Sequence, residues 1–441
     1  MRTGIPPPRV STTGVLCSSV SSEPGKPRGG LGRTAKLGRN FGHVWSAAGC
    51  SNLGDGIVKV SLPLFAVQLT DSPAGVAGVT VAAYLPWILV SLPAGALADR
   101  LDRRTTMLVV NLARAAVVGV LALLAVQDTG GLATIYIAAF ALGTGETLFD
   151  TSAQSLLPAV VDRTRLTRAN SRLFALEQTT NEFIGPPLGG WLTGLGVAYA
   201  LATSSVLFLV AAVFLSLLTG RYKSAQSAGT TLRVEIVEGI RFLYGSTLLR
   251  TTVIIVAILN LVGIATLAVL PLYAIEPRFL GLSEFGYGTL LLGFGVGGLI
   301  GSTVAEPLQQ RVGRARALVG AVTGSSVWMV ALALTRNIVV IALAMVLSGI
   351  GIMILNVIGI TFRQLITPTR LLGRVVAAHR VVVLGVVPLG AAAGGAIAEL
   401  VPFRVLFGLC GVVGLALVVP AAFFWRDEAM DSAEAGALGQ S

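Results

Sequence analysis

The sequence predicts an all-α membrane protein with twelve transmembrane helices in two six-helix bundles, and three observations support this. Of the 441 residues, 54% are hydrophobic and 12% are charged, with a mean hydropathy of +0.82, whereas soluble domains carry about 25% charged residues. Twelve apolar runs reach the length of about 20 residues that a helix needs to cross a bilayer. These runs also lack the alternating pattern of a membrane β-barrel.

The twelve apolar runs are the predicted spans. In chain order they cover 41–69, 75–97, 105–126, 132–157, 170–194, 197–219, 251–275, 286–309, 316–335, 338–364, 375–398 and 404–425. The one long internal connection follows the sixth run. The expected organisation is a disordered basic cytoplasmic tail at 1–38, an N-terminal bundle at 39–220, a cytoplasmic linker at 221–250, a C-terminal bundle at 251–425 and a cytoplasmic tail at 426–441.

The linker contains the stretch LRVEIVEGIRFLYG. Its apolar residues Leu232, Ile236, Ile240 and Leu243 recur at helical spacing on one face. We therefore expect an amphipathic helix that lies on the membrane surface.

The distribution of Lys and Arg predicts the orientation. Most of them fall in the N-terminal tail and around the connections after spans 2, 4, 6, 8 and 10, whereas only Arg278, Arg336 and Arg404 fall on the opposite side. Because cytoplasmic loops carry the excess of Lys and Arg, both termini are expected in the cytoplasm. The expected location of the protein is the plasma membrane. The net charge of +11 then reflects membrane topology, and no nucleic-acid partner is expected.

The two halves of the sequence repeat each other. Asn52-Leu53 recurs as Asn260-Leu261, and Gly189-Gly190 recurs as Gly394-Gly395. An even number of spans in each half gives a parallel repeat with a pseudo-twofold axis along the membrane normal. This symmetry is typical of secondary transporters.

The connection after span 2 reads GALADRLDRR, from Gly95 to Arg104. One interpretation is ordinary cytoplasmic positive charge. The other is a salt-bridge latch between the halves, because Asp99 adds nothing to a positive charge signal and sits next to arginines with which it can pair. The residues proposed for the latch are Gly95, Asp99, Arg100, Arg103 and Arg104.

GALADRLDRR resembles the loop 2–3 signature of the major facilitator superfamily. Gly95, Asp99, Arg100 and Arg103 match that signature, while Asp102 stands where the family usually has glycine. The stretches SNLGDG, TLFDTSAQSLLPAVV and ANSRLFALEQTTNEFIGPPLGGWL resemble the drug-exporter branch that includes siderophore exporters. The resemblance covers about residues 40–425 and implies proton antiport, with spans 1, 4, 7 and 10 around a central cavity.

The GPPLGG stretch of span 5 resembles an antiporter motif, although Asn181 stands where that motif has glycine. Prolines bend the helix, and glycines four residues apart allow another helix to approach closely. A packing kink and a seal of the outer gate remain alternative interpretations. The candidate gate residues are Asn181, Glu182, Gly185, Pro186, Gly189 and Gly190. The GFGVGG stretch at 293–298 lies within a span, so it predicts helix packing and no nucleotide site.

Charged residues inside the spans mark the candidate site, because each charge at mid-bilayer costs roughly 2.5–3.5 kcal/mol on insertion scales. Asp55 and Lys59 share a face of span 1, and Glu146 and Asp150 share a face of span 4. We expect Asp55 and Lys59 to neutralise each other, either as a structural pair or as a proton-exchanging one, with Glu146 and Asp150 as rival proton carriers. The predicted proton-coupling and cavity residues are Asp55, Lys59, Glu146, Asp150, Asn52, Asn260 and Asn356.

These observations predict a secondary active transporter that exports small, hydrophobic or amphipathic compounds by proton antiport with alternating access. The alternative is a proton symporter or facilitator for uptake of a small metabolite. No enzyme is expected, because three scattered cysteines and two histidines form neither a nucleophile–base pattern nor a metal-binding one. The expected partners of this monomer are a small-molecule substrate and the lipid bilayer. A proton gradient is the expected energy source, without a cofactor or a metal.

Overall fold

The structure is a computed structural model that describes residues 37–90, 101–162, 165–220, 222, 232–368 and 371–438. Over these residues every regular element is a helix, so the expected all-α class is confirmed for this part of the chain. Gly95, Asp99 and Arg100, and the basic tail up to residue 36, lie outside the described residues.

We call the helices before residue 220 the first set. They are α1 (Arg39–Leu69), α2 (Pro73–Leu89), α4 (Arg103–Val126), α5 (Leu132–Val160), the continuous segment of α6 (Leu166–Glu177), η2 (Gln178–Ile184) and α7 (Gly185–Leu195), and α8 (Val197–Ser216).

The second set follows α9 (Leu232–Gly245). It consists of α10 (Thr247–Ile275), α11 (Glu284–Val312), α12 (Arg314–Leu334), α13 (Ile338–Ile366), α14 (Leu372–Leu400), α15 (Phe403–Ala416) and α16 (Val418–Phe424), and α17 (Asp427–Leu438) ends the described chain. Among the described helices, nine segments are long and apolar enough to cross a membrane by length and composition. The α1, α2 and α6–η2–α7 segments are not among these nine.

Several helices begin at a side chain that caps them. Ser72, Asp102, Ser246 and Ser283 each accept a hydrogen bond from the backbone N–H three residues further on, and Asn337 accepts two. Such caps satisfy N–H groups that have no partner inside the helix. They fix where α2, α4, α10, α11 and α13 start.

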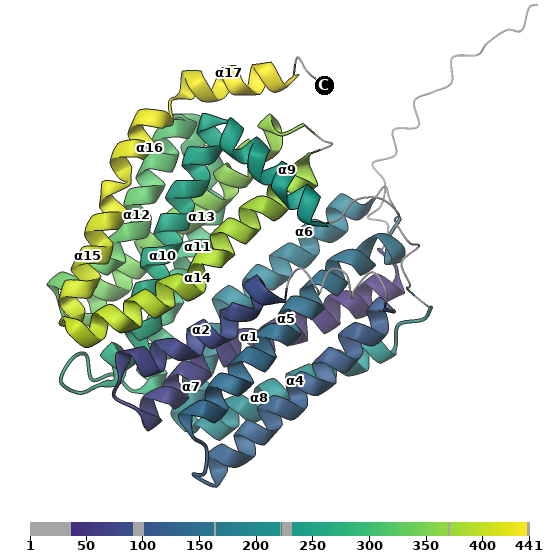
Figure 1. Cartoon of the computed structure of the whole chain (residues 1–441), viewed down its shortest axis with the longest axis vertical. Coiled ribbons are helices and arrows are strands. Elements are labelled where there is room, and N and C mark those ends of the chain that lie inside the picture. Colours follow the sequence, from purple (N-terminus) through teal and green to yellow (C-terminus); the bar gives the residue numbers. More distant parts are fainter. Residues whose placement is uncertain are drawn as a thin grey trace, which may run out of the picture. The chain divides into compact units, whose positions relative to one another are not determined.

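The two sets repeat the same helix contacts. In the first set α8 packs against α1 and α4, α5 packs against α2 and α4, and α7 packs against α1. In the second set α15 packs against α10 and α12, α13 packs against α11 and α12, and α14 packs against α10. Figure 1 shows α1, α4, α5 and α8 running side by side, as do α10, α12, α13 and α15.

Glycines bring about the matching contacts of α7 and α14. A Cβ added at Gly189 would lie 2.6 Å from the Ile57 carbonyl oxygen of α1, and one at Gly394 would lie 2.2 Å from the Ala265 carbonyl oxygen of α10. The sequence repeat of Gly189 and Gly394 therefore corresponds to one kind of helix crossing, made twice. The predicted packing role of GFGVGG is also confirmed, because a Cβ at Gly297 would lie 2.0 Å from the Val346 carbonyl oxygen of α13.

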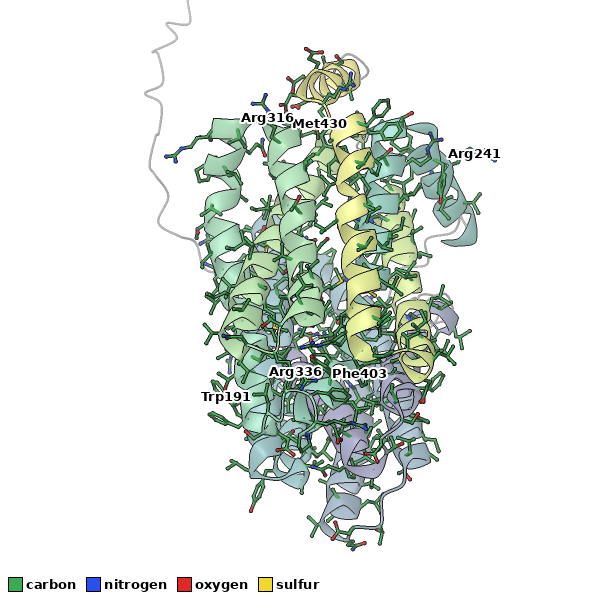
Figure 2. The ribbon with its side chains drawn as sticks, turned by 90° about the vertical axis from the view of Figure 1, so that its left-hand side faces the viewer. Trp191, Arg241, Arg316, Arg336, Phe403 and Met430 are labelled. Atoms are coloured by element: carbon green, nitrogen blue, oxygen red, sulfur yellow. The ribbon has the colours of Figure 1, made fainter. Side chains whose placement is uncertain are left out.

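The helices have two distinguishable ends. One end carries the connections 70–72, 127–131, 276–283, 335–337 and 401–402, and we call it the short-loop end. Figure 2 shows Trp191, Arg336 and Phe403 toward this end, with Arg241, Arg316 and Met430 at the opposite end. The alternation of ends along the chain is what successive membrane crossings require.

Two helices outside the sets lie at that opposite end (Figure 1). In α9, which packs against α14, Ile240 and Leu243 join the second set's apolar core, and Glu238 forms an ion pair with Arg374. The predicted linker helix is thus present and attached to α14. In α17, Asp427 accepts a hydrogen bond from the Ala315 backbone N–H at the start of α12.

Candidate functional site

A buried ion pair joins α1 to α4. The Asp55 carboxylate contacts the Arg114 guanidinium, and the two side chains are 9% and 2% exposed. Arg114 also donates to the Ser51 hydroxyl at 3.1 Å and lies over the Phe208 ring of α8, 4.3 Å from its centroid. A charged group that is removed from water requires such partners, and here α1, α4 and α8 provide them together.

Lys59 has a different partner. Its ammonium lies 2.7 Å from a carboxylate oxygen of Glu182 in η2. The prediction that Asp55 and Lys59 neutralise each other is therefore wrong. A pair four residues apart on one helix gains about 0.2–0.5 kcal/mol, and partners on neighbouring helices outweigh this small gain.

The π-helical segment η2 shapes the next part of the site. Pro186 lacks an N–H and its ring crowds the carbonyl of the residue four positions earlier, and local widening into a π-helix relieves such strain. On this segment, buried Asn181 donates to the Glu146 carboxylate of α5 at 3.5 Å, and the Asn181 Oδ1 has no hydrogen-bond partner. Buried amide oxygens without a partner are uncommon in folded proteins, and this one lies beside a carboxylate.

Asp150, one turn beyond Glu146, pairs across the sets. Its carboxylate lies 3.6 Å from the Arg380 guanidinium of α14. Arg380 also lies over the Trp87 ring of α2, 5.0 Å from its centroid. We call Asp55, Arg114, Lys59, Glu182, Glu146, Asp150 and Arg380 the charged network.

The distribution of Lys and Arg assigns Arg380 only to the cytoplasmic excess of charge near the connection after span 10. Its position inside the predicted span 375–398 was the signal that could have identified it, because charges within spans are rare and functional. Of the predicted asparagines, Asn52 is buried in α1, Asn260 is half-buried in α10 and Asn356 is exposed on α13. The described contacts do not bring these three into the charged network. Within the described part of the chain, no cluster of His, Cys, Asp or Glu could hold a metal ion.

The described loop 2–3 residues bind within the first set. Arg103 donates to the Ser155 carbonyl of α5, and Arg104 donates to the carbonyls of Leu215 and Ser216 at the end of α8. Carbonyls at a helix C-terminus attract cations. These contacts differ from the predicted latch between the halves, which would require Arg103 and Arg104 to reach the second set.

Asp102 holds the same region. Its carboxylate caps α4 through the Thr105 N–H at 3.0 Å and accepts the Tyr222 N–H at 2.8 Å. Partial burial alone would raise the pKa of Asp102, but these hydrogen bonds favour the carboxylate and the pKa is lowered overall. The residue that departs from the family signature thus joins the start of α4 to the chain that follows α8.

The GPPLGG glycines divide their roles between the sets. Gly185 packs against Gly56 of α1, and Gly189 packs against the backbone of Ile57, the next residue of α1. Gly190 faces the second set, where an added Cβ would lie 2.4 Å from the Gly288 Cα of α11. Packing explains Gly185 and Gly189, whereas the gate interpretation fits Gly190.

Further contacts join the sets at the short-loop end. The Trp191 indole donates to the Thr289 hydroxyl at 3.0 Å and stacks on Phe285. On the other seam, the Glu399 carboxylate of α14 accepts hydrogen bonds from the Ser72 hydroxyl and the Ala74 N–H at the start of α2. The two sets are therefore in close contact at this end.

Comparison with known proteins agrees with this architecture. The family model of the transmembrane secretion effectors matches residues 36–439. The chain is 27% identical over 403 residues to the multidrug efflux pump Tap of Mycolicibacterium fortuitum, covering 88% of this chain and 96% of Tap.

Solved structures show the same fold. A bacterial homologue of the iron transporter ferroportin, described in an inward-facing state, superposes with a TM-score of 0.67 at 17% identity, over 88% of this chain and 98% of that one. The nucleoside transporter NupG superposes with a TM-score of 0.64 at 11% identity, over 88% of this chain and 98% of NupG. The chain belongs to the transmembrane secretion effector family, within the major facilitator superfamily of membrane transporters.

Proposed function

We propose that this protein exports small hydrophobic or amphipathic compounds by proton antiport, with alternating access between two six-helix bundles of twelve spans in all. The observation that carries the proposal is the matched pair of seams between the sets: α7 packs on α1 and reaches α11, as α14 packs on α10 and reaches α2. Two repeated bodies joined along two equivalent seams can rock about a site between them. The efflux activity of the relative Tap supports the direction of transport.

The charged network supports proton coupling. Carboxylates inside spans mark ion pathways and proton relays. Glu146 and Asp150 come from the first set, whereas Arg380 comes from the second. A change of charge on these carboxylates would therefore act where the two sets meet.

An apolar pocket supports the substrate class. Its volume is about 590 Å³, and α2, α5 and α14 line it with Gly78, Leu85, Phe140, Ala396 and other apolar residues. The one lining hydroxyl, that of Tyr136, is bonded to the Gly75 carbonyl. Such a pocket between the sets suits hydrocarbon and aromatic groups. We propose it as a route by which membrane-dissolved compounds reach the charged network.

The remaining features of the proposal follow from the sequence. Both termini face the cytoplasm, as do the helix ends opposite the short loops, because the excess of Lys and Arg lies at that end of the helices. In this orientation, the contacts between the sets at the short-loop end support a state that is closed toward the outside of the cell. We expect a monomer that uses the proton gradient as its energy source and needs no cofactor.

Cellular accumulation tests this proposal. Cells expressing the protein and matched vector cells are loaded with a panel of fluorescent amphipathic dyes. We expect lower accumulation of some dyes in expressing cells, and a protonophore should abolish the difference. Asp150→Asn at equal membrane expression is the control for nonspecific effects, and it should resemble the vector. Gradient-dependent accumulation above the vector level would instead indicate uptake by symport, and no difference for any dye would contradict the substrate class.

A further inference from the structure

Arg380 is the member of the charged network that comes from the second set. Its guanidinium pairs with the Asp150 carboxylate of α5 and lies over the Trp87 ring of α2, and it also interacts electrostatically with the Glu177 carboxylate of α6. Asp150 is 13% exposed and Arg380 is 40% exposed, so the ion pair lies at the margin of water-accessible space. An ion pair in this position is less screened than one on a surface, and a proton can still reach it.

The surroundings of Asp150 make its charge sensitive to a proton. The carboxylates of Glu146 on α5 and Glu177 on α6 act electrostatically on Asp150, as do the guanidiniums of Arg114 and Arg380. Arg114 is already paired with Asp55. Arg380 is therefore the cation whose position depends on the charge of Asp150. On α14 the adjacent titratable side chain is His379, which is half-buried.

We propose that Arg380 is the coupling residue of transport. Its position responds to the protonation state of Asp150, and this response changes the contacts of the second set. This inference rests on the proposed antiport and deepens it. Asp150 and Arg380 both lie nearer the end of their helices that is opposite the short loops. While Asp150 is charged, its attraction for Arg380 holds α14 against α5 there and opposes separation of the sets at that opposite end. When a proton from solvent binds the Asp150 carboxylate, that attraction disappears, and Arg380 keeps its contact with the Trp87 ring and its electrostatic interaction with the Glu177 carboxylate of α6.

Trp87 gives the released guanidinium a second partner. An arginine over an aromatic face is stabilised without a counter-charge, so the cation is not left unpaired when Asp150 is neutral. Trp87 is on α2, which together with α14 forms one of the two seams. Protonation of Asp150 therefore removes an ion pair between α14 and α5 and leaves a weaker cation–aromatic contact between α14 and α2.

The test measures conformation directly. Spin labels are placed through Leu69→Cys and Leu400→Cys, in a background without native cysteines, because both side chains are exposed and lie at the short-loop ends of α1 and α14. Pulsed EPR gives the ratio of open to closed short-loop ends in reconstituted protein. Lowering the pH releases the link nearer the opposite end and so favours the state that is closed at the short-loop end. This ratio should therefore fall on the order of tenfold, which corresponds to about 1.4 kcal/mol.

Variants identify the sensor. The double variant Asp150→Asn/Arg380→Gln leaves no stranded charge, so it should fold and show a ratio that is independent of pH. Arg380→Lys keeps the cation and should retain the pH response. The matched control is Arg374→Gln, which breaks the ion pair of the same helix with Glu238 of α9. It should behave as the parent protein does.

The outcomes separate this inference from the proposed function. A parent-like pH response in Asp150→Asn/Arg380→Gln would overturn the coupling role of Arg380, even if the dye experiment shows gradient-dependent export. Loss of the response in Arg374→Gln would also overturn it, because any break along α14 would then suffice. Failure of export for every dye, with the Arg380-dependent response intact, would refute the proposed substrate class alone.

Discussion

The carboxylate of Asp55 on α1 faces the guanidinium of Arg114 on α4, and not the ammonium of Lys59 on its own helix. This relationship divides the intramembrane charges of α1 into two kinds. Asp55 is sealed among α1, α4 and α8, whereas Lys59 and Glu182 are 27% and 48% exposed. A structural role therefore fits Asp55 better than proton exchange, and the groups that water can reach are better placed to move protons.

The first prediction concerns Asp55 and Arg114. Asp55→Asn leaves a buried guanidinium unpaired, and Arg114→Met leaves a buried carboxylate. Each should lower the free energy of unfolding by about 3–5 kcal/mol. The double variant should recover much of the loss, as measured by thermal unfolding in detergent. In a parallel cycle, Asp55→Asn and Lys59→Met should be additive. A large coupling energy between positions 55 and 59 would contradict the observed pairing.

The second prediction concerns Lys59 and Glu182. Because both side chains are partly exposed, Lys59→Met and Glu182→Gln should each change the free energy of unfolding by about 1 kcal/mol or less. The same thermal unfolding measurement checks this, with Asp55→Asn as the internal reference. A loss from Lys59→Met as large as that from Asp55→Asn would show that water does not screen this pair.

The third prediction concerns Gly190. A methyl group at this position meets the Gly288 backbone of α11, so Gly190→Ala should separate the sets at the short-loop end. We expect a higher open-to-closed ratio for the Leu69/Leu400 spin-label pair. Gly263→Ala is the matched control, because an added Cβ there has no neighbour within 4 Å. An unchanged ratio in Gly190→Ala would show that the GPPLGG stretch serves only helix packing within the first set.

The fourth prediction concerns the pH dependence of Asp102. Its pKa is lower in the folded protein, so its contribution is present at neutral pH and is lost as the pH falls through the folded-state pKa. Asp102→Ala should cost about 1 kcal/mol at neutral pH, the usual value of a helix cap. The difference in stability between the parent protein and Asp102→Ala, measured by thermal unfolding, should become smaller in acid. Asp102→Asn keeps a neutral acceptor for Thr105, and its own contribution should not vary with pH. A gap that stays constant in acid would show that the carboxylate charge is not what stabilises this junction.

The fifth prediction concerns topology. Reporter fusions at Gly130, Leu282 and Asn337 should be extracytoplasmic, and those at Asp162, Ser227 and Thr369 should be cytoplasmic, as the Lys and Arg distribution indicates. Ser227 and Thr369 lie outside the described residues. Alkaline phosphatase and fluorescent-protein fusions distinguish the two sides. Two adjacent connections on the same side would contradict the arrangement of six spans in each half.

The sequence by itself determined the class of the protein and the positions of its helices. Apolar runs of bilayer length can satisfy their backbone groups only as helices, and so the helix limits follow the runs closely, for example 103–126 for a run predicted at 105–126. The internal repeat was also visible in the sequence, because glycines at helix crossings cannot be replaced without separating the helices. Gly189 and Gly394 mark equivalent crossings for this reason.

The tertiary structure decided which charges pair. Spacing along a helix shows only which side chains share a face, and the energy of such a local pair is small beside that of a partner on another helix. Arg114 pairs with Asp55, and Glu182 pairs with Lys59. Arg380 pairs with Asp150, although more than half the length of the chain separates them in sequence. Which helices lie next to each other fixes these pairs, and that proximity depends on packing of the whole molecule, which local sequence does not encode.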